Sequence, residues 1–191
     1  MPSPVYPDGA DPASYRGLPV LYEYRNTDGD LCRFNCGQAA ACTFLVHHGA
    51  LPEELDAELG RAIMTAVEGA HPPDNAGGWL GTSRRRVERI CHIHGVDVEE
   101  VAGEDDLRRR LAEGRPVIVM VGTDGPRIWK WRAPAGHWMV AYGFDDHQVF
   151  LTNHHAPGMP WDEFRRRWNA FVPRLISMRN TGLTAARPAT T

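Results

Sequence analysis

The chain has 191 residues, of which 42% are hydrophobic and 24% charged, and this composition is typical of a single globular domain. The formal net charge of -3 gives no electrostatic reason to expect a nucleic acid or a membrane as a partner. The first seven residues lack the basic and apolar stretches of a signal peptide, and no apolar run is long enough to span a bilayer. We therefore expect a cytoplasmic protein with its cysteines as free thiols, namely Cys32, Cys36, Cys42 and Cys91.

The first half of the chain is predicted to be helical. Residues 1–20 are rich in proline and are expected to form an irregular arm. Four helices should follow, because each apolar-periodic stretch is bounded by a residue that favours a helix end. The expected ends are an Asn35 cap with a Gly49 stop, a Pro52 start with apolar positions up to Val67, a Thr82 cap with a Gly95 stop, and, for a short helix around Leu107 and Leu111, a stop at Gly114.

The second half is predicted to form a sheet. Strands are expected over residues 116–121, 137–144, 148–152 and 175–178, with a last short helix opening at residues 160–164. Helices followed by a mostly antiparallel sheet indicate an α+β fold. We assign residues 21–178 to one catalytic domain and expect residues 179–191, which are small and polar, to be a flexible tail.

Cys36 is the strongest candidate for a reactive residue. It lies in the first turn of the predicted helix, where free amide groups and the helix dipole favour an anion. A thiolate is the competent nucleophile for acyl transfer. The alternative is a small buried hydrophobic residue, which is the usual role of a free cysteine, and position alone does not separate the two.

His137 and Asn153 are predicted to lie opposite each other. The strands before and after the turn Asp145-Asp146-His147 should form a hairpin. Counting outward from that turn brings His137 opposite residue 153, to within two positions. A side-chain amide there could accept the imidazole N–H and fix the tautomer, which completes a Cys-His-Asn arrangement.

Two motifs surround these residues. The first is Asn35-Cys36-Gly37-Gln38-Ala39-Ala40, and the second runs from Gly136-His137-Trp138 to Asp145-Asp146. In their order and spacing they resemble the nucleophile and histidine motifs of the C39-like family of papain-like cysteine peptidases. The resemblance spans about residues 20–178. It implies a papain-like fold with N-terminal helices packed on the sheet, a peptidase activity without a cofactor, and Cys36, His137 and Asn153 as catalytic residues.

One position departs from the family pattern. The family usually places a glutamine six residues before the nucleophile as an oxyanion donor, and this chain has Asp30 there. A carboxylate repels a developing oxyanion unless it is protonated. The donor could therefore be Asn26, Asn35, a protonated Asp30 or the backbone N–H of Cys36. Further candidates for oxyanion or substrate contacts are the motif residues Gln38 and Trp138.

Three functions remain open from the sequence. The leading one is hydrolysis of a peptide or amide bond through a thioester on Cys36. The second is a biosynthetic acyltransferase or cyclase that uses an acyl thioester, including one bound to a carrier protein. The third is an inactive papain-fold protein that only binds a peptide. No metal is expected, because the cluster Cys91-His92-Ile93-His94 lacks the spacing of a zinc site.

Overall fold

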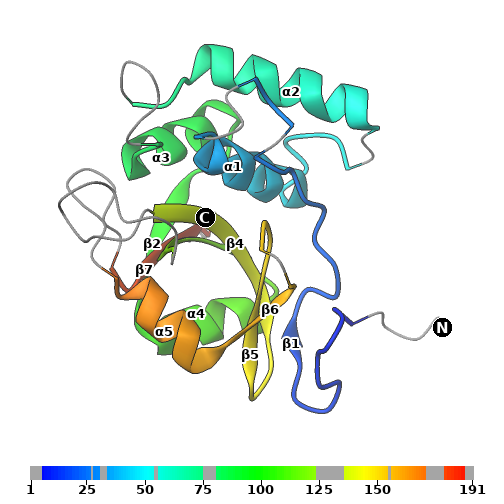
Figure 1. The fold of residues 1–191 in the computed structure, drawn as a ribbon, viewed down its shortest axis with the longest axis vertical. Helices are drawn as coiled ribbons and strands as arrows, with labels where there is room; N and C mark the ends of the chain where they lie inside the picture. The colour runs from blue at the N-terminus through cyan, green and yellow to red at the C-terminus, as the bar shows by residue number, and fades with distance from the viewer. Residues whose placement is uncertain are drawn as a thin grey trace.

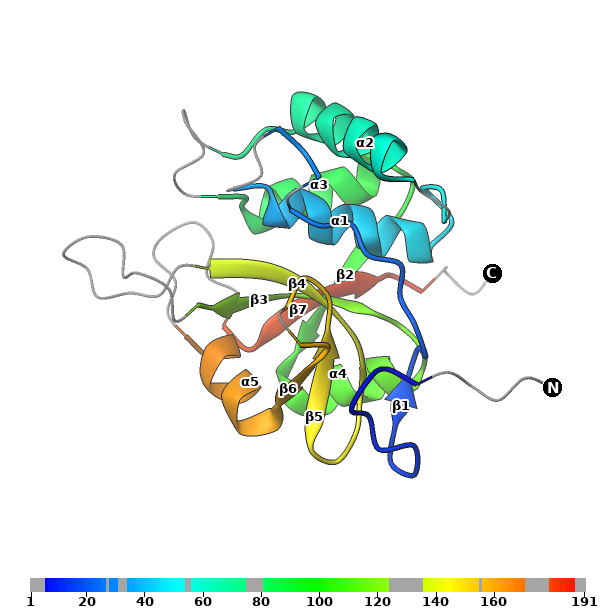
Figure 2. The same cartoon turned by 45° about the vertical axis from the view of Figure 1, so that its right-hand side comes forward.

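The computed structural model describes residues 6–26, 28–30, 34–53, 56–74, 81–123, 136–154, 156–170 and 179–187. Three helices, α1 (Cys36–His47), α2 (Ala57–Ala70) and α3 (Arg84–Ile93), lie on one side of an antiparallel sheet (Figure 1). Two further helices, α4 (Gly103–Ala112) and α5 (Trp161–Trp168), lie on the other side, as Figure 2 also shows. The α+β fold and the helical N-terminal layer predicted from the sequence are confirmed.

The sheet is built from strands that are far apart in the chain. Their order is β2 (Val98–Ala102), β7 (Thr181–Ala185), β3 (Val117–Gly122), β4 (Gly136–Phe144), β5 (Gln148–Leu151) and β6 (Gly158–Pro160). The two-residue strand β1 (Arg16–Gly17) of the N-terminal arm pairs with the far end of β4. Strand β4 is thus the central element, since it pairs with β1, β3 and β5.

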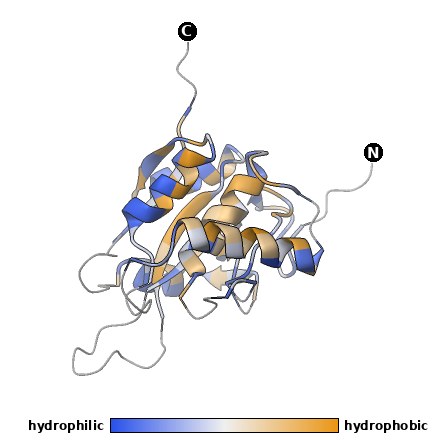
Figure 3. Ribbon diagram, turned by 90° about the horizontal axis from the view of Figure 1, so that it is seen from above, coloured by the Kyte–Doolittle hydropathy of each residue, from blue (hydrophilic) through white to orange (hydrophobic). Residues whose placement is uncertain are grey.

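Alternation along the strands separates two hydrophobic cores. Ile118 of β3 and Trp138 of β4 face α1, α2 and α3, whereas Val119 and Met139 face α4 and α5. Helix α1 lies between the sheet and the other two helices, so its residues from Cys36 to Val46 are all buried. Figure 3 agrees with this division, because hydrophobic ribbon lies in the middle of the molecule and hydrophilic ribbon towards its edges.

Two of the predicted helix starts are wrong by a few residues. Helix α2 begins after Asp56 and not at Pro52. The Asp56 carboxylate caps it by accepting the Leu59 N–H at 2.7 Å. Helix α3 is capped by Ser83 and not by Thr82. The Thr82 hydroxyl instead donates to another side chain, described below. Sequence patterns locate an apolar stretch better than they locate its first residue.

The C-terminal part of the chain differs most from the expectation. The strand expected over 175–178 lies outside the described residues, as does Cys32. Residues 179–187 are not a flexible tail, because β7 is inserted into the sheet between the edge strand β2 and β3. The sequence Thr181-Gly182-Leu183-Thr184-Ala185 contains a single large apolar side chain, so its composition does not indicate a strand.

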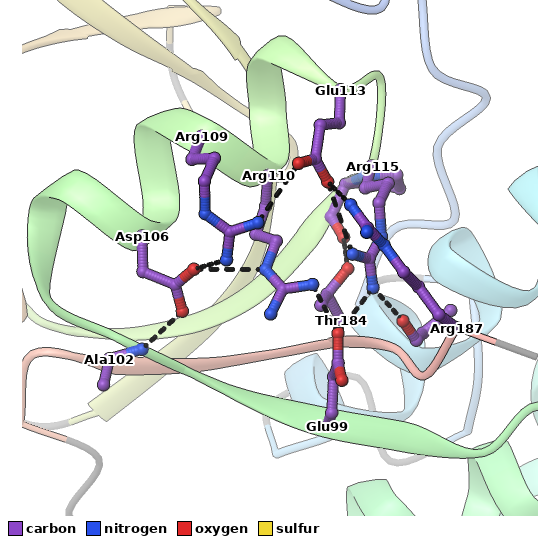
Figure 4. A network of polar contacts seen from close by, with 11 residues as sticks. Glu99, Ala102, Asp106, Arg109, Arg110, Glu113, Arg115, Thr184 and Arg187 are labelled. Carbon is purple, nitrogen blue, oxygen red and sulfur yellow. Dashed lines mark hydrogen bonds and ion pairs between the residues drawn. The ribbon is translucent and has the colours of Figure 1, made fainter. Parts of the chain in front are cut away.

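A polar network fixes β7 and its continuation to α4 and β2 (Figure 4). Arg115 binds both the carboxylate of Glu99, at 2.8 Å, and the main-chain carbonyl of Ala185. Arg187 reaches Glu113 at the end of α4, also at 2.8 Å. These contacts join the last described residues to elements formed some 70 residues earlier in the chain.

No helix within the described ranges combines the length and hydrophobicity needed to cross a bilayer.

Candidate active site

Cys36 is the first residue of α1, at the end of the helix that packs on β4. Its side chain contacts the main-chain N–H groups of Cys36, Gly37 and Trp138, all of which favour the thiolate. Burial acts in the opposite direction and is the larger effect, so it raises the pKa of the Cys36 thiol. The resting group is a protonated thiol, whereas the position at a helix start had suggested a stabilised thiolate. At 9% exposure, Cys36 still reaches the surface.

The start of α1 leaves amide groups available. Asn35 occupies the cap position, but its side chain makes no capping hydrogen bond within the described structure. It is fully buried, and its amide group donates to the carboxylate of Glu68. The first N–H groups of a helix have no partner inside the helix, and here those of Cys36 and Gly37 contact the Cys36 sulfur. They can therefore bind a developing negative charge, whereas the Asn35 side chain itself faces the interior.

His137 is held at one ring nitrogen. Its Nε2 lies 3.1 Å from the main-chain oxygen of Asn153. A carbonyl can only accept, so Nε2 carries the hydrogen and Nδ1 keeps the lone pair. Burial lowers the pKa of His137, and the hydrogen bond to Asn153 offsets this only in part. At neutral pH the ring is therefore a neutral base with Nδ1 as its basic atom.

Asn153 lies next to His137 as the hairpin predicts, but the contact uses a different group. The expected partner was the side-chain amide, and the observed partner is the main-chain carbonyl. The side-chain Nδ2 is buried and has no hydrogen-bond partner in the described structure. The residue adopts the left-handed conformation, with φ 56°, and its own N–H donates to Oε1 of Glu23 at 2.6 Å. A bulge in β4 between Ala141 and Gly143 shifts the register that simple counting assumed.

A cavity of about 440 Å³ lies beside His137. It is lined by Glu23, Arg25, Asn26, His137, Asn153 and His154. A second cavity, of about 260 Å³, shares Glu23 and Arg25 with the first and extends towards the start of α2. Glu23 and Arg25 thus lie where the two cavities meet. Sequence reasoning missed Glu23 and Arg25, because no motif marks them.

Of the three oxyanion candidates that precede Cys36, namely Asn26, Asp30 and Asn35, only Asn26 lines the cavity beside His137. Asp30, at the position where the family has glutamine, is exposed and lines neither cavity. The spacing from the nucleophile therefore does not locate the side chain that faces the histidine.

Gln38 and Trp138 are both buried in the interior. The Gln38 amide donates to the carbonyl of His71 at 2.9 Å and accepts the Thr82 hydroxyl at 2.7 Å. The Trp138 indole donates to the carbonyl of Thr82 at 2.8 Å. Their polar atoms are therefore used inside the protein, where they connect α1 and β4 to Thr82. Neither has a polar group left to bind a substrate.

The two other described cysteines lie away from these cavities. Cys42 and Cys91 are fully buried, and burial raises the pKa of both thiols, that of Cys91 to about 12. Across the described ranges, no group of three or more histidine, cysteine or acidic side chains is arranged to hold a metal ion. Of the three described cysteines, Cys36 is the one at the start of a helix, next to the strand β4 that carries His137.

The sequence matches no family model and no curated protein. The fold, however, is similar to that of a protein from Bacillus anthracis described as a C39-like peptidase. That structure has a TM-score of 0.55 and 10% identity, and the alignment covers 81% of this chain and 90% of that one. The peptidase domain of Streptococcus ComA, a bi-functional ABC transporter of a quorum-sensing pathway, gives a TM-score of 0.54 with 15% identity, over 87% and 99% of the two chains. The chain therefore has the α+β, papain-like fold of C39-like peptidases.

Proposed function

We propose that this protein is a cysteine hydrolase that cleaves a peptide or amide bond through a thioester on Cys36, with His137 as general base. One observation carries the proposal. The Cys36 side chain contacts the main-chain N–H of Trp138, and the preceding residue is a histidine whose Nε2 is already occupied. The free ring nitrogen, Nδ1, is then the atom available to the thiol. The papain-like fold supports this reading.

In the first chemical step, one proton passes from the thiol through His137 to the leaving amine. Because both groups are neutral at rest, Nδ1 of His137 removes the thiol proton as the sulfur attacks the carbonyl carbon. The imidazolium then donates that proton to the leaving amine, the C–N bond breaks, and a thioester remains on Cys36. The hydrogen bond from Nε2 to Asn153 becomes stronger when the ring is charged, which stabilises the imidazolium.

The oxyanion would be held at the start of α1. The main-chain N–H of Cys36 is one donor, and the side chain of Asn26, which lines the cavity beside His137, is proposed as the second. Asp30 is then not needed in this role.

The second step is hydrolysis of the thioester by water. His137 takes a proton from the water as it attacks, and returns it to the departing sulfur. The described lining of the cavity is polar, with Glu23, Arg25 and Asn26 among its residues. Such a lining admits water, and this favours hydrolysis over transfer to another acceptor.

Reaction with p-nitrophenyl acetate tests the chemistry without knowledge of the natural substrate. The wild-type protein should release a burst of about one equivalent of p-nitrophenolate and gain one acetyl group, located on Cys36 by peptide mass mapping. Cys36→Ala should abolish the burst, and His137→Gln should slow it by roughly 10²–10⁴-fold. Cys91→Ala is the matched control and should keep it. A wild-type protein that is acetylated elsewhere, or not at all, would disprove the proposal.

The fate of the acetyl group separates hydrolysis from transfer. Loss of the group in buffer alone supports a hydrolase, whereas a stable acetyl-enzyme that reacts only with an added amine would support the transferase. The burst rate should also rise with pH through a pKa below 6.5, because the base must be neutral and burial lowers the pKa of His137. A rate that rose only through a pKa above 6.5 would contradict this assignment of the base.

A further inference from the structure

We infer that Glu23 is a positioning residue: its carboxylate holds the main chain of Asn153 in the conformation that presents the Asn153 carbonyl to His137. The inference rests on the proposed function, since it concerns the same histidine.

Two hydrogen bonds link Glu23 to His137 through the main chain of Asn153. Oε1 of Glu23 accepts the N–H of Asn153 at 2.6 Å, and the carbonyl of Asn153 accepts Nε2–H of His137 at 3.1 Å. Both main-chain polar groups of Asn153 are thus bonded to residues that are distant in the chain. Glu23 lies 130 positions earlier in the chain and is partly buried in the wall of the cavity beside His137.

The conformation of Asn153 requires such support. Its φ of 56° is in the left-handed region, which is unfavourable for an ordinary residue and less so for asparagine. Its side-chain Nδ2 makes no hydrogen bond with any described residue, so the side chain does not hold the turn in place. Within the described structure, the hydrogen bond that the Asn153 N–H donates to Glu23 is the contact that fixes the N–H side of this residue. Without it, the peptide could rotate and withdraw the carbonyl from His137.

Glu23 acts by orienting the main chain of Asn153 and not through its negative charge. The pKa of His137 responds to burial and to the Asn153 carbonyl, and the Glu23 carboxylate is not among its causes. The group that Glu23 binds is an uncharged N–H. A glutamine presents an oxygen acceptor of the same reach, so it should replace Glu23, whereas an apolar side chain of similar length should not.

The matched variants Glu23→Gln and Glu23→Met test this prediction. Glu23→Gln should acylate with p-nitrophenyl acetate within about threefold of the wild-type rate, with the same pH profile. Glu23→Met should be slower by up to roughly 10²-fold, because a misplaced base loses its alignment with the thiol. Glu23→Asp provides a third variant that keeps the charge but shortens the reach, and it should resemble Glu23→Met.

A second measurement does not depend on activity. Two-dimensional NMR of ¹⁵N-histidine-labelled protein should show His137 with its hydrogen on Nε2 in the wild type and in Glu23→Gln. In Glu23→Met or Glu23→Asp the spectrum should show a mixture of the two tautomers. Unchanged rate and tautomer in both would overturn the inference, as would a Glu23→Gln variant as slow as Glu23→Met. A wild-type protein without acylation but with these tautomers would disprove only the proposed function.

Discussion

At the residue scale, the candidate site depends on main-chain groups as much as on side chains. The sequence identified Cys36, His137 and Asn153, because cysteine at a helix start and histidine in a strand follow recognisable patterns. It assigned the orienting role to the Asn153 side chain, while the contact is made by the main-chain carbonyl. A carbonyl belongs to every residue, so no residue type marks it. What the asparagine contributes is tolerance of the left-handed conformation.

Replacement of Asn153 separates these two roles. Asn153→Gly keeps the carbonyl and adopts a positive φ without strain, so its acylation rate should stay within a few-fold of the wild type. Asn153→Ala should lose about 1 kcal/mol of stability and react more slowly, because alanine disfavours this conformation. The measurements are burst kinetics with p-nitrophenyl acetate and urea unfolding. Equal loss of rate in both variants would instead assign the orienting role to the side-chain amide.

At the element scale, the motif around Cys36 is largely explained by the packing of α1. A Cβ atom on Gly37 would lie 2.5 Å from the Cβ of Thr82, so only glycine lets α1 approach Thr82 this closely. Gln38 binds the Thr82 hydroxyl across the same contact. Of the motif residues, Cys36 supplies the proposed chemistry, whereas Gly37 and Gln38 position the helix that carries it.

This packing reverses the usual effect of a glycine-to-alanine change in a helix. Gly69→Ala, at an exposed position of α2 with open space at its Cβ, should stabilise the protein by about 0.5–1 kcal/mol. Gly37→Ala should destabilise it by about 1–3 kcal/mol, because the Thr82 backbone must move. Urea unfolding of the two variants measures both signs. Stabilisation by Gly37→Ala would show that α1 and Thr82 are less closely packed than described.

The elements that the sequence predicted are those with strong local signals. Helix α1 follows from its Asn35 cap and Gly49, and β3 and β4 from their continuous apolar runs. Elements whose formation depends on distant partners were missed. Strand β2 carries two charged residues among five. Of these, Glu99 forms ion pairs with Arg110 and Arg115. Glu23 was missed for the same reason, since its partner lies 130 residues away.

At the scale of the whole molecule, the last described strand completes a sheet begun in the middle of the chain. Strand β7 pairs with β2 on one side and β3 on the other, and Leu183 is buried in the core that faces α1. Without β7, the facing polar groups of both neighbouring strands would lose their partners, and β2 would be separated from β3. The N-terminal helices rest on this sheet, so the geometry of the candidate site depends on residues near the C-terminus.

Truncation tests this dependence. A chain that ends at Asn180 loses β7 and should lose most of a folding free energy of roughly 5–15 kcal/mol, with no cooperative urea transition and poor dispersion in its NMR spectrum. A chain that ends at Arg187 keeps the β7 pairings and the Arg187–Glu113 ion pair, and should unfold within about 0.5 kcal/mol of the full chain. Leu183→Asp in the full chain should act like the shorter truncation, because it buries an unpaired carboxylate. If the chain ending at Asn180 unfolded cooperatively at the same urea concentration as the full chain, residues 181–187 would be the dispensable tail that their composition suggests.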